Sequence, residues 1–137
     1  GVSNFTIRHL EELVDCCDVV PAVNQVEFSP FFYQKELIEY CRKNKIQLEA
    51  YSPLTRGKKL QDPRLLELAA KYGKTPAQVL IRWSLQQGLV VLPKSRTKAR
   101  IFENAEVFDF EIGRKDMDAL GSFNEGFRTG HDPGKIP

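Results

Sequence analysis

The stretch Leu89-Val90-Val91-Leu92 decides which fold class the sequence predicts. Four consecutive apolar residues have the length of a short strand, and an unbroken apolar run is typical of a parallel strand buried on both faces. Two more strands are expected at residues 20–28 and 46–51, because both contain β-forming residues and lead into a Ser-Pro pair. These three segments predict a parallel sheet.

Helical patterns lie between and after the strands. Asp62-Pro63 and Thr75-Pro76-Ala77-Gln78 predict helix starts, the second as a capping box with proline in its first turn. Helices are expected at about residues 6–17, 34–43, 62–73, 75–88, 97–105 and 114–120, and residues 121–137 as a long loop. The first helix is expected to bury Leu10, Leu13, Val14 and Cys17. This order predicts an α/β protein with right-handed crossovers.

The strand count leaves two architectures open. Three strands do not close an eight-stranded barrel. The pattern alone therefore allows both part of a barrel and an open, doubly wound sheet.

Length and composition restrict the class of protein. The chain has 137 residues, 42% of them apolar and 28% charged, as expected for one globular domain. A net charge of +2 does not favour nucleic acid or a membrane surface as partner, and no apolar run reaches the roughly 18–20 residues of a membrane span. Three cysteines do not form a secreted disulfide framework, so we expect a reducing, cytoplasmic location. Because the chain starts at Gly1 and its single methionine is Met117, we expect a piece of a longer protein.

Polar residues at the carboxyl ends of the strands are the candidates for a ligand site, since both architectures bind ligands there. Four places qualify: Ser3-Asn4, whose strand is expected to lie upstream of this chain, Asn24-Gln25, Tyr51-Ser52 and Lys94-Ser95. If buried, the two amides need hydrogen-bond partners, which neighbouring loops or a ligand would both supply. Tyr51 could act as a general acid, as a stacking surface for a planar ligand or as a core ring. Because no Lys or Asp lies near it in the sequence, stacking or packing is favoured.

The stretch 94–100 holds four basic residues and no acid, directly after the apolar run and at a helix start. Free N–H groups at a helix start suit a phosphate, and Lys94 and Arg100 would add charge. Glu103 and Asn104 share the helix face of Arg100, where they suit a base such as adenine. The alternative is a solvated basic turn, which the charge run alone favours. The sequence contains no G-x-G-x-x-G or Walker-type loop and no metal-ligand spacing.

Taken in order along the chain, these motifs resemble the aldo-keto reductase superfamily. The matching stretches are Gly1-Val2-Ser3-Asn4-Phe5, Asn24-Gln25-Val26-Glu27, Tyr51-Ser52-Pro53-Leu54, Leu92-Pro93-Lys94-Ser95 followed by Arg100, Glu103 and Asn104, and Val107-Phe108-Asp109-Phe110. One match would be weak, whereas five in order across essentially the whole chain are specific. The resemblance implies a (β/α)8 TIM barrel that reduces aldehydes and ketones with NADPH. Residues 1–137 would be a single partial domain, the C-terminal half of that barrel.

The resemblance also implies a set of cofactor-binding residues. Ser3, Asn4 and Gln25 would hold the nicotinamide carboxamide, Tyr51 would stack on the nicotinamide ring, and Ser52 and Leu54 would line the pyrophosphate path. Lys94, Ser95 and Arg100 would hold the adenosine 2′-phosphate with Arg96 as a further cation beside it, and Glu103 and Asn104 would face adenine. No catalytic residue and no metal ligand is expected in this chain, since the family's catalytic Asp, Tyr, Lys and His lie in the N-terminal half.

The resemblance leaves the substrate open. Residues 121–137 match the family's substrate loop, its most variable part, so the expected partner is a small carbonyl compound of unspecified structure. The complete protein is expected to be a monomer. The alternative is a non-catalytic relative that binds NADPH in a structural or regulatory role. An unrelated phosphosugar-binding barrel is a third reading, and it would show no preference for a dinucleotide.

Overall fold

A computed structural model describes residues 1–135, and its centre is a four-stranded sheet. The strands lie in the order β1 (Val2–Ser3), β2 (Val23–Glu27), β3 (Gln47–Tyr51) and β4 (Val90–Leu92), and each neighbouring pair is parallel. The carboxyl ends of the strands therefore meet at one edge of the sheet, which brings the predicted site residues to the same side. The predicted α/β class with a parallel sheet is confirmed.

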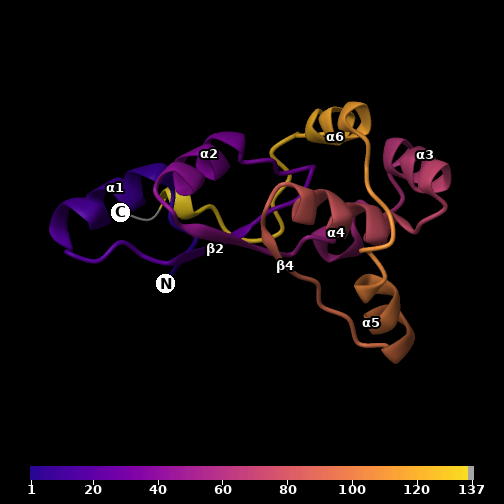
Figure 1. Cartoon of the computed structure of the whole chain (residues 1–137), viewed down its shortest axis with the longest axis horizontal. Coiled ribbons are helices and arrows are strands. Elements are labelled where there is room, and N and C mark those ends of the chain that lie inside the picture. The colour runs from indigo at the N-terminus through magenta and orange to yellow at the C-terminus, as the bar shows by residue number, and fades with distance from the viewer. Residues whose placement is uncertain (136–137) are drawn as a thin grey trace.

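The helices follow the predicted order. The described residues form α1 (Ile7–Cys16), α2 (Lys35–Lys43), α3 (Pro63–Tyr72), α4 (Pro76–Gln86), α5 (Lys98–Ala105) and α6 (Arg114–Gly121), with short 3-10 turns at Thr55–Gly57 and Pro133–Lys135. Figure 1 shows α1 at one end of the long axis and α3 at the other, and the C-terminal segment returns to lie beside α1. In the part of the chain that the structure describes, no helix is long and apolar enough to cross a membrane.

Local signals set the start of α4, which lines the site described below. The Gln78 N–H donates to Thr75 Oγ1 at 3.3 Å, and the Thr75 N–H donates to Gln78 Oε1 at 3.0 Å, so the predicted capping box is confirmed. Asp62 likewise accepts from the Arg64 N–H at the start of α3. Each cap satisfies backbone donors that the first turn of a helix leaves free.

Aromatic packing fixes α4 against the sheet and the C-terminal helix. The fully buried Trp83 ring stacks on Phe28 with ring centroids 5.3 Å apart and meets the edge of Tyr33 at 5.0 Å. The Trp83 Nε1–H donates to the Met117 carbonyl of α6 at 3.2 Å. Because α4 is held on both sides, its first turn keeps a fixed place above the sheet edge.

The strand predictions are corrected in two places. Val2 and Ser3 form β1 by pairing with Asn24 and Gln25, although so short a segment carries no strand pattern of its own. The second strand starts at Val23 rather than residue 20, because Pro21 lacks a backbone donor. Only the ladder with the neighbouring strand identifies β1.

The stretch that predicted the sheet is not buried on both faces. Leu89 is 5% exposed, but Val90 and Leu92 are 44% and 40% exposed. The reason is that β4 is an edge strand, and no described element covers the face on which Val90 and Leu92 lie. Leu10 of α1 is buried as predicted and Leu13 is half-buried, whereas Val14 and Cys17, which directly follows the helix, are exposed, because α1 lies at one end of the long axis of the molecule (Figure 1).

Candidate functional site

A groove of about 950 Å³ runs along the carboxyl ends of β3 and β4. Its walls come from the loop after β3, the first turn of α4 and the start of α5. Nine of the twelve predicted residues line this groove: Tyr51, Ser52, Leu54, Lys94, Ser95, Arg96, Arg100, Glu103 and Asn104. The structure therefore gathers most of the predicted set into one elongated site.

The basic end of the groove consists of Lys94, Arg96 and Arg100. All three side chains are exposed, and none forms an ion pair with any of residues 1–135. Ser95 Oγ accepts from the Thr97 N–H at 3.4 Å, which shapes the turn into α5. Unpaired cations beside the N–H groups of a helix start make this end suited to an anionic ligand.

Glu103 and Asn104 lie one turn further along α5 and close the same end of the groove. The Glu103 carboxylate accepts from Thr75 Oγ1 at 2.9 Å, which ties α5 to the start of α4. Asn104 is 7% exposed and lines the groove, and its side-chain amide makes no hydrogen bond with the described residues. Since no buried side-chain N or O atom among residues 1–135 lacks a partner, the Asn104 amide is open to the groove, where it is available to hydrogen-bond a ligand.

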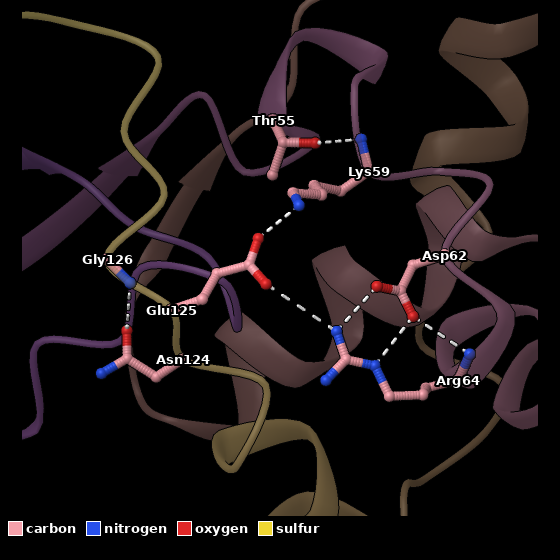
Figure 2. Close-up of polar contacts among 7 residues, drawn as sticks. All are labelled: Thr55, Lys59, Asp62, Arg64, Asn124, Glu125 and Gly126. Atoms are coloured by element: carbon pink, nitrogen blue, oxygen red, sulfur yellow. Dashed lines mark hydrogen bonds and ion pairs between the residues drawn. The ribbon is translucent and has the colours of Figure 1, made fainter.

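The loop after β3 adopts a conformation that the sequence did not indicate. Ser52, Thr55 and Arg56 have φ angles of 50°, 53° and 52°, in the left-handed region that non-glycine residues rarely adopt. Thr55 is buried and holds the loop from inside: its Oγ1 accepts from the Lys59 N–H at 3.1 Å, as Figure 2 shows. Several strained residues in one segment are typical of a functional loop.

This loop also supplies groove residues that sequence reasoning missed. Arg56 and Gln61 line the groove from the loop, and Thr75 and Ala77 line it from the start of α4. Arg56 adds a fourth cation to a groove whose one carboxylate is Glu103. The basic run Arg56-Gly57-Lys58-Lys59 is the sequence signal for Arg56. A run of charges in a loop, however, does not show which side chain faces the site.

The tyrosine end of the groove is formed by Tyr51, with Asn4 beside it. The Tyr51 hydroxyl donates to Asn4 Oδ1 at 3.0 Å. Burial raises the pKa of the Tyr51 hydroxyl, and the neighbouring Glu27 carboxylate raises it further, whereas the hydrogen bond to Asn4 acts in the opposite direction. The hydroxyl is thus engaged and protonated, and the ring forms part of the groove wall.

The remaining predicted residues lie beside the groove rather than in it. Ser3 Oγ donates to the Gln25 carbonyl at 3.1 Å, and Gln25 Nε2 donates to Glu49 Oε2 at 2.9 Å. Ser3 and Asn4 line a second cavity of about 370 Å³ between α1 and the C-terminal segment. Gln25 lines neither space, since its amide faces Glu49 on the neighbouring strand.

Asn24, the other amide of the predicted pair, has a structural role. It is fully buried, its Nδ2 donates to the Phe5 carbonyl at 2.9 Å, and its Oδ1 accepts from the Phe5 N–H at 3.3 Å. These bonds fix the chain directly after Asn4. Among residues 1–135, no group of three or more His, Cys, Asp or Glu side chains is arranged to hold a metal ion.

A parallel sheet with a groove at the carboxyl ends of its strands, lined by four cations, places the chain among the α/β proteins that bind ligands at that edge of the sheet. A sequence model of the aldo/keto reductase family matches residues 1–125. The chain belongs to that family.

Curated relatives agree with this assignment. The chain is 50% identical over 133 residues to an uncharacterized oxidoreductase, YtbE, of Bacillus subtilis (strain 168), covering 97% of this chain and 48% of YtbE. It is 48% identical to a glyoxal reductase of the same organism (99% and 49% covered) and 45% identical to methylglyoxal reductase DkgA of Escherichia coli (strain K12; 97% and 49%). The chain thus spans about half the length of the curated relatives it matches.

Solved structures show the same relation. A Gox0644 variant in complex with NADPH superposes with a TM-score of 0.93 at 44% identity, covering all of this chain and 51% of that one. A Bombyx mori aldo-keto reductase in complex with NADP gives a TM-score of 0.85 at 36% identity, with 93% and 45% covered. The predicted fold class, part of a (β/α)8 barrel, is confirmed by such structures.

Proposed function

We propose that this chain supplies the NADPH-binding part of a reductase that converts small aldehydes and ketones to alcohols. The groove carries the proposal, because it places unpaired cations at one end and an aromatic ring at the other. NADPH has phosphates at one end and a flat nicotinamide ring at the other, and when bound it supplies the hydride for carbonyl reduction.

The residues of the groove fit this cofactor. Lys94, Arg96 and Arg100 are exposed and lack ion-pair partners among residues 1–135, so a 2′-phosphate would neutralise charge that is otherwise unpaired. Asn104 has an amide available to hydrogen-bond adenine, whereas Glu103 already accepts from Thr75. Ser52 and Leu54 line the same groove, and we propose that they line the pyrophosphate path.

At the other end, we propose that Tyr51 offers its ring and not its proton. Its hydroxyl donates to Asn4, which leaves the ring face to pack against nicotinamide. Ser3, Asn4 and Gln25 are proposed to hold the carboxamide beside it. The proton for the product alcohol would then come from an acid outside these 137 residues, as part of the Asp, Tyr, Lys and His set that the family resemblance implies.

We propose residues 1–137 as one partial domain of the barrel, with 121–137 as its substrate loop. Two relatives are named glyoxal reductase and methylglyoxal reductase, so small dicarbonyl compounds are the substrates to test first.

The test uses a complete barrel that contains this chain. We expect NADPH to bind at least about tenfold more tightly than NADH in a fluorescence titration, since a charge-assisted contact to phosphate is worth more than one factor of ten. We also expect NADPH oxidation when methylglyoxal is added. Equal affinity for the two cofactors would contradict the 2′-phosphate site. Tight NADPH binding without turnover on any small carbonyl compound would favour the non-catalytic relative.

A further inference from the structure

Glu27, at the carboxyl end of β2, is a buried carboxylate whose partners come from the far end of the chain. It is 4% exposed, and its Oε1 accepts from the Thr129 N–H at 2.5 Å and from Thr129 Oγ1 at 2.6 Å. Its Oε2 accepts from the Gly130 N–H at 3.0 Å. A buried carboxylate destabilises the fold unless it is hydrogen-bonded. Among residues 1–135, the three donors to the Glu27 carboxylate all belong to the C-terminal segment.

At Gly130 the segment passes close to both Glu27 and Tyr51. A Cβ atom added at Gly130 would lie 3.3 Å from Glu27 Oε2 and 3.4 Å from the Tyr51 hydroxyl. The first distance is tighter than most side-chain contacts, whereas the second is an ordinary van der Waals contact, so a larger residue would crowd the Glu27 carboxylate first. The position of Gly130 is therefore set jointly by Glu27 and by the tyrosine end of the groove.

Beyond this point the segment forms the wall of the second cavity. His131 and Pro133 line the 370 Å³ space together with Ser3, Asn4 and α1 residues such as Leu13. Glu27 lines neither cavity itself. It determines the second cavity only through the segment that it holds.

The upstream part of the segment is attached independently. Glu125 forms an ion pair with Lys59, and Arg64 approaches the same carboxylate at 4.0 Å, as Figure 2 shows. The Arg128 guanidinium carbon lies 4.1 Å from the centroid of the Phe32 ring. Arg128 also forms an ion pair with Asp132 at 3.4 Å. Loss of the Glu27 contacts would therefore free Thr129 and Gly130 in particular, while Arg128 and the residues before it stay in place.

We propose that Glu27 is a positioning residue that anchors the Thr129–Gly130 backbone, and so fixes the C-terminal segment that we propose as the substrate loop. The substrate part rests on the proposed function. The anchor itself rests only on the contacts described above.

Trypsin tests the anchor, because the bond after Arg128 lies directly before the anchored residues. In a complete barrel without cofactor, Glu27→Gln presents an amide donor to one of the tail N–H groups. We expect it to raise the rate of cleavage at Arg128 about tenfold, as expected for loss of charge-assisted hydrogen bonds. Glu36→Gln makes the same charge change at an exposed position of α2 and should leave the rate unchanged.

Kinetics test the consequence for the substrate. Glu27→Gln should raise the KM for methylglyoxal about tenfold with kcat within about twofold, the pattern of lost binding rather than lost chemistry. The dissociation constant for NADPH should stay close to that of the parent protein. A fall in kcat with KM unchanged would overturn the positioning role.

Two further variants keep the test decisive if Glu27→Gln fails to melt cooperatively. Thr129→Val removes one donor without touching the sheet, and Gly130→Ala crowds Glu27 with a Cβ atom 3.3 Å from Oε2 while the carboxylate itself is retained. Both should increase cleavage at Arg128, and unchanged cleavage in both would overturn the anchor. Increased cleavage in a protein that binds no NADPH would support the anchor while contradicting the proposed function.

Discussion

The two ends of the groove are built in opposite ways. At the tyrosine end, the Tyr51 hydroxyl is hydrogen-bonded to Asn4. The adjoining Asn24 is fully buried and hydrogen-bonded to the backbone of Phe5. At the basic end, Lys94 and Arg100 are exposed and form no ion pair with residues 1–135. The tyrosine end is thus shaped before any ligand arrives, which reduces the entropy lost on binding, whereas the basic end contributes charge without fixed geometry.

The largest expected effect is on the basic end. In a complete barrel, Lys94→Ala combined with Arg100→Ala should weaken NADPH binding by about 3 kcal/mol or more, roughly 100-fold, since two charge-assisted contacts to phosphate are lost. NADH affinity should change less than about threefold because it lacks the 2′-phosphate. Fluorescence titration of both cofactors measures the difference. An equal loss of affinity for the two cofactors would mean that Lys94 and Arg100 do not contact the 2′-phosphate.

The next effect concerns stability and the tyrosine end. Asn24→Ala should lower the free energy of unfolding by about 2–3 kcal/mol, because the Phe5 N–H and carbonyl lose their buried partner. Arg96→Ala, at the exposed basic end, should change it by less than about 0.5 kcal/mol. Urea unfolding of both variants in a complete barrel gives the comparison. Similar costs at the two sites would contradict the claim that only one end is preformed.

A smaller effect separates the ring of Tyr51 from its hydroxyl. Tyr51→Ala should weaken NADPH binding by about 1 kcal/mol through loss of a stacking surface, whereas Tyr51→Phe should keep most of the affinity and turnover. Because the pKa of Tyr51 is raised, its hydroxyl should stay protonated up to and beyond the ordinary value of about 10, so its deprotonation should produce no step in NADPH affinity below that pH. Titration and single-turnover rates check both statements. Loss of the chemical step in Tyr51→Phe would assign the proton to Tyr51.

The smallest effect is that of salt. Exposed charges are screened strongly between roughly 0.05 and 0.5 M ionic strength, so NADPH affinity should fall about threefold more than NADH affinity over this range. The Lys94→Ala and Arg100→Ala double variant should lose this difference. A salt response that is the same for both cofactors would place the 2′-phosphate away from the exposed cations.

Much of the fold could be read from local sequence because the signals act over a few residues. The capping box of Thr75 and Gln78 joins residues three apart, and the basic turn follows directly from the order of residues 94–100. Hydrophobic periodicity placed the helices for the same reason. The family motifs identified twelve proposed cofactor residues, and nine of them line one groove in the structure.

Other features depend on segments that meet only in the folded chain. The sequence alone determined the α/β order, the helix starts and the charge of the basic turn, since each depends on near neighbours. Only the tertiary structure decided that Val2 and Ser3 form a strand, that Val90 faces outward on an edge, and that Arg56 takes a left-handed conformation facing the groove. It also decided that Glu27 holds Thr129, because hydrogen bonds between distant residues follow from how the chain packs and leave no mark in the local pattern of either segment.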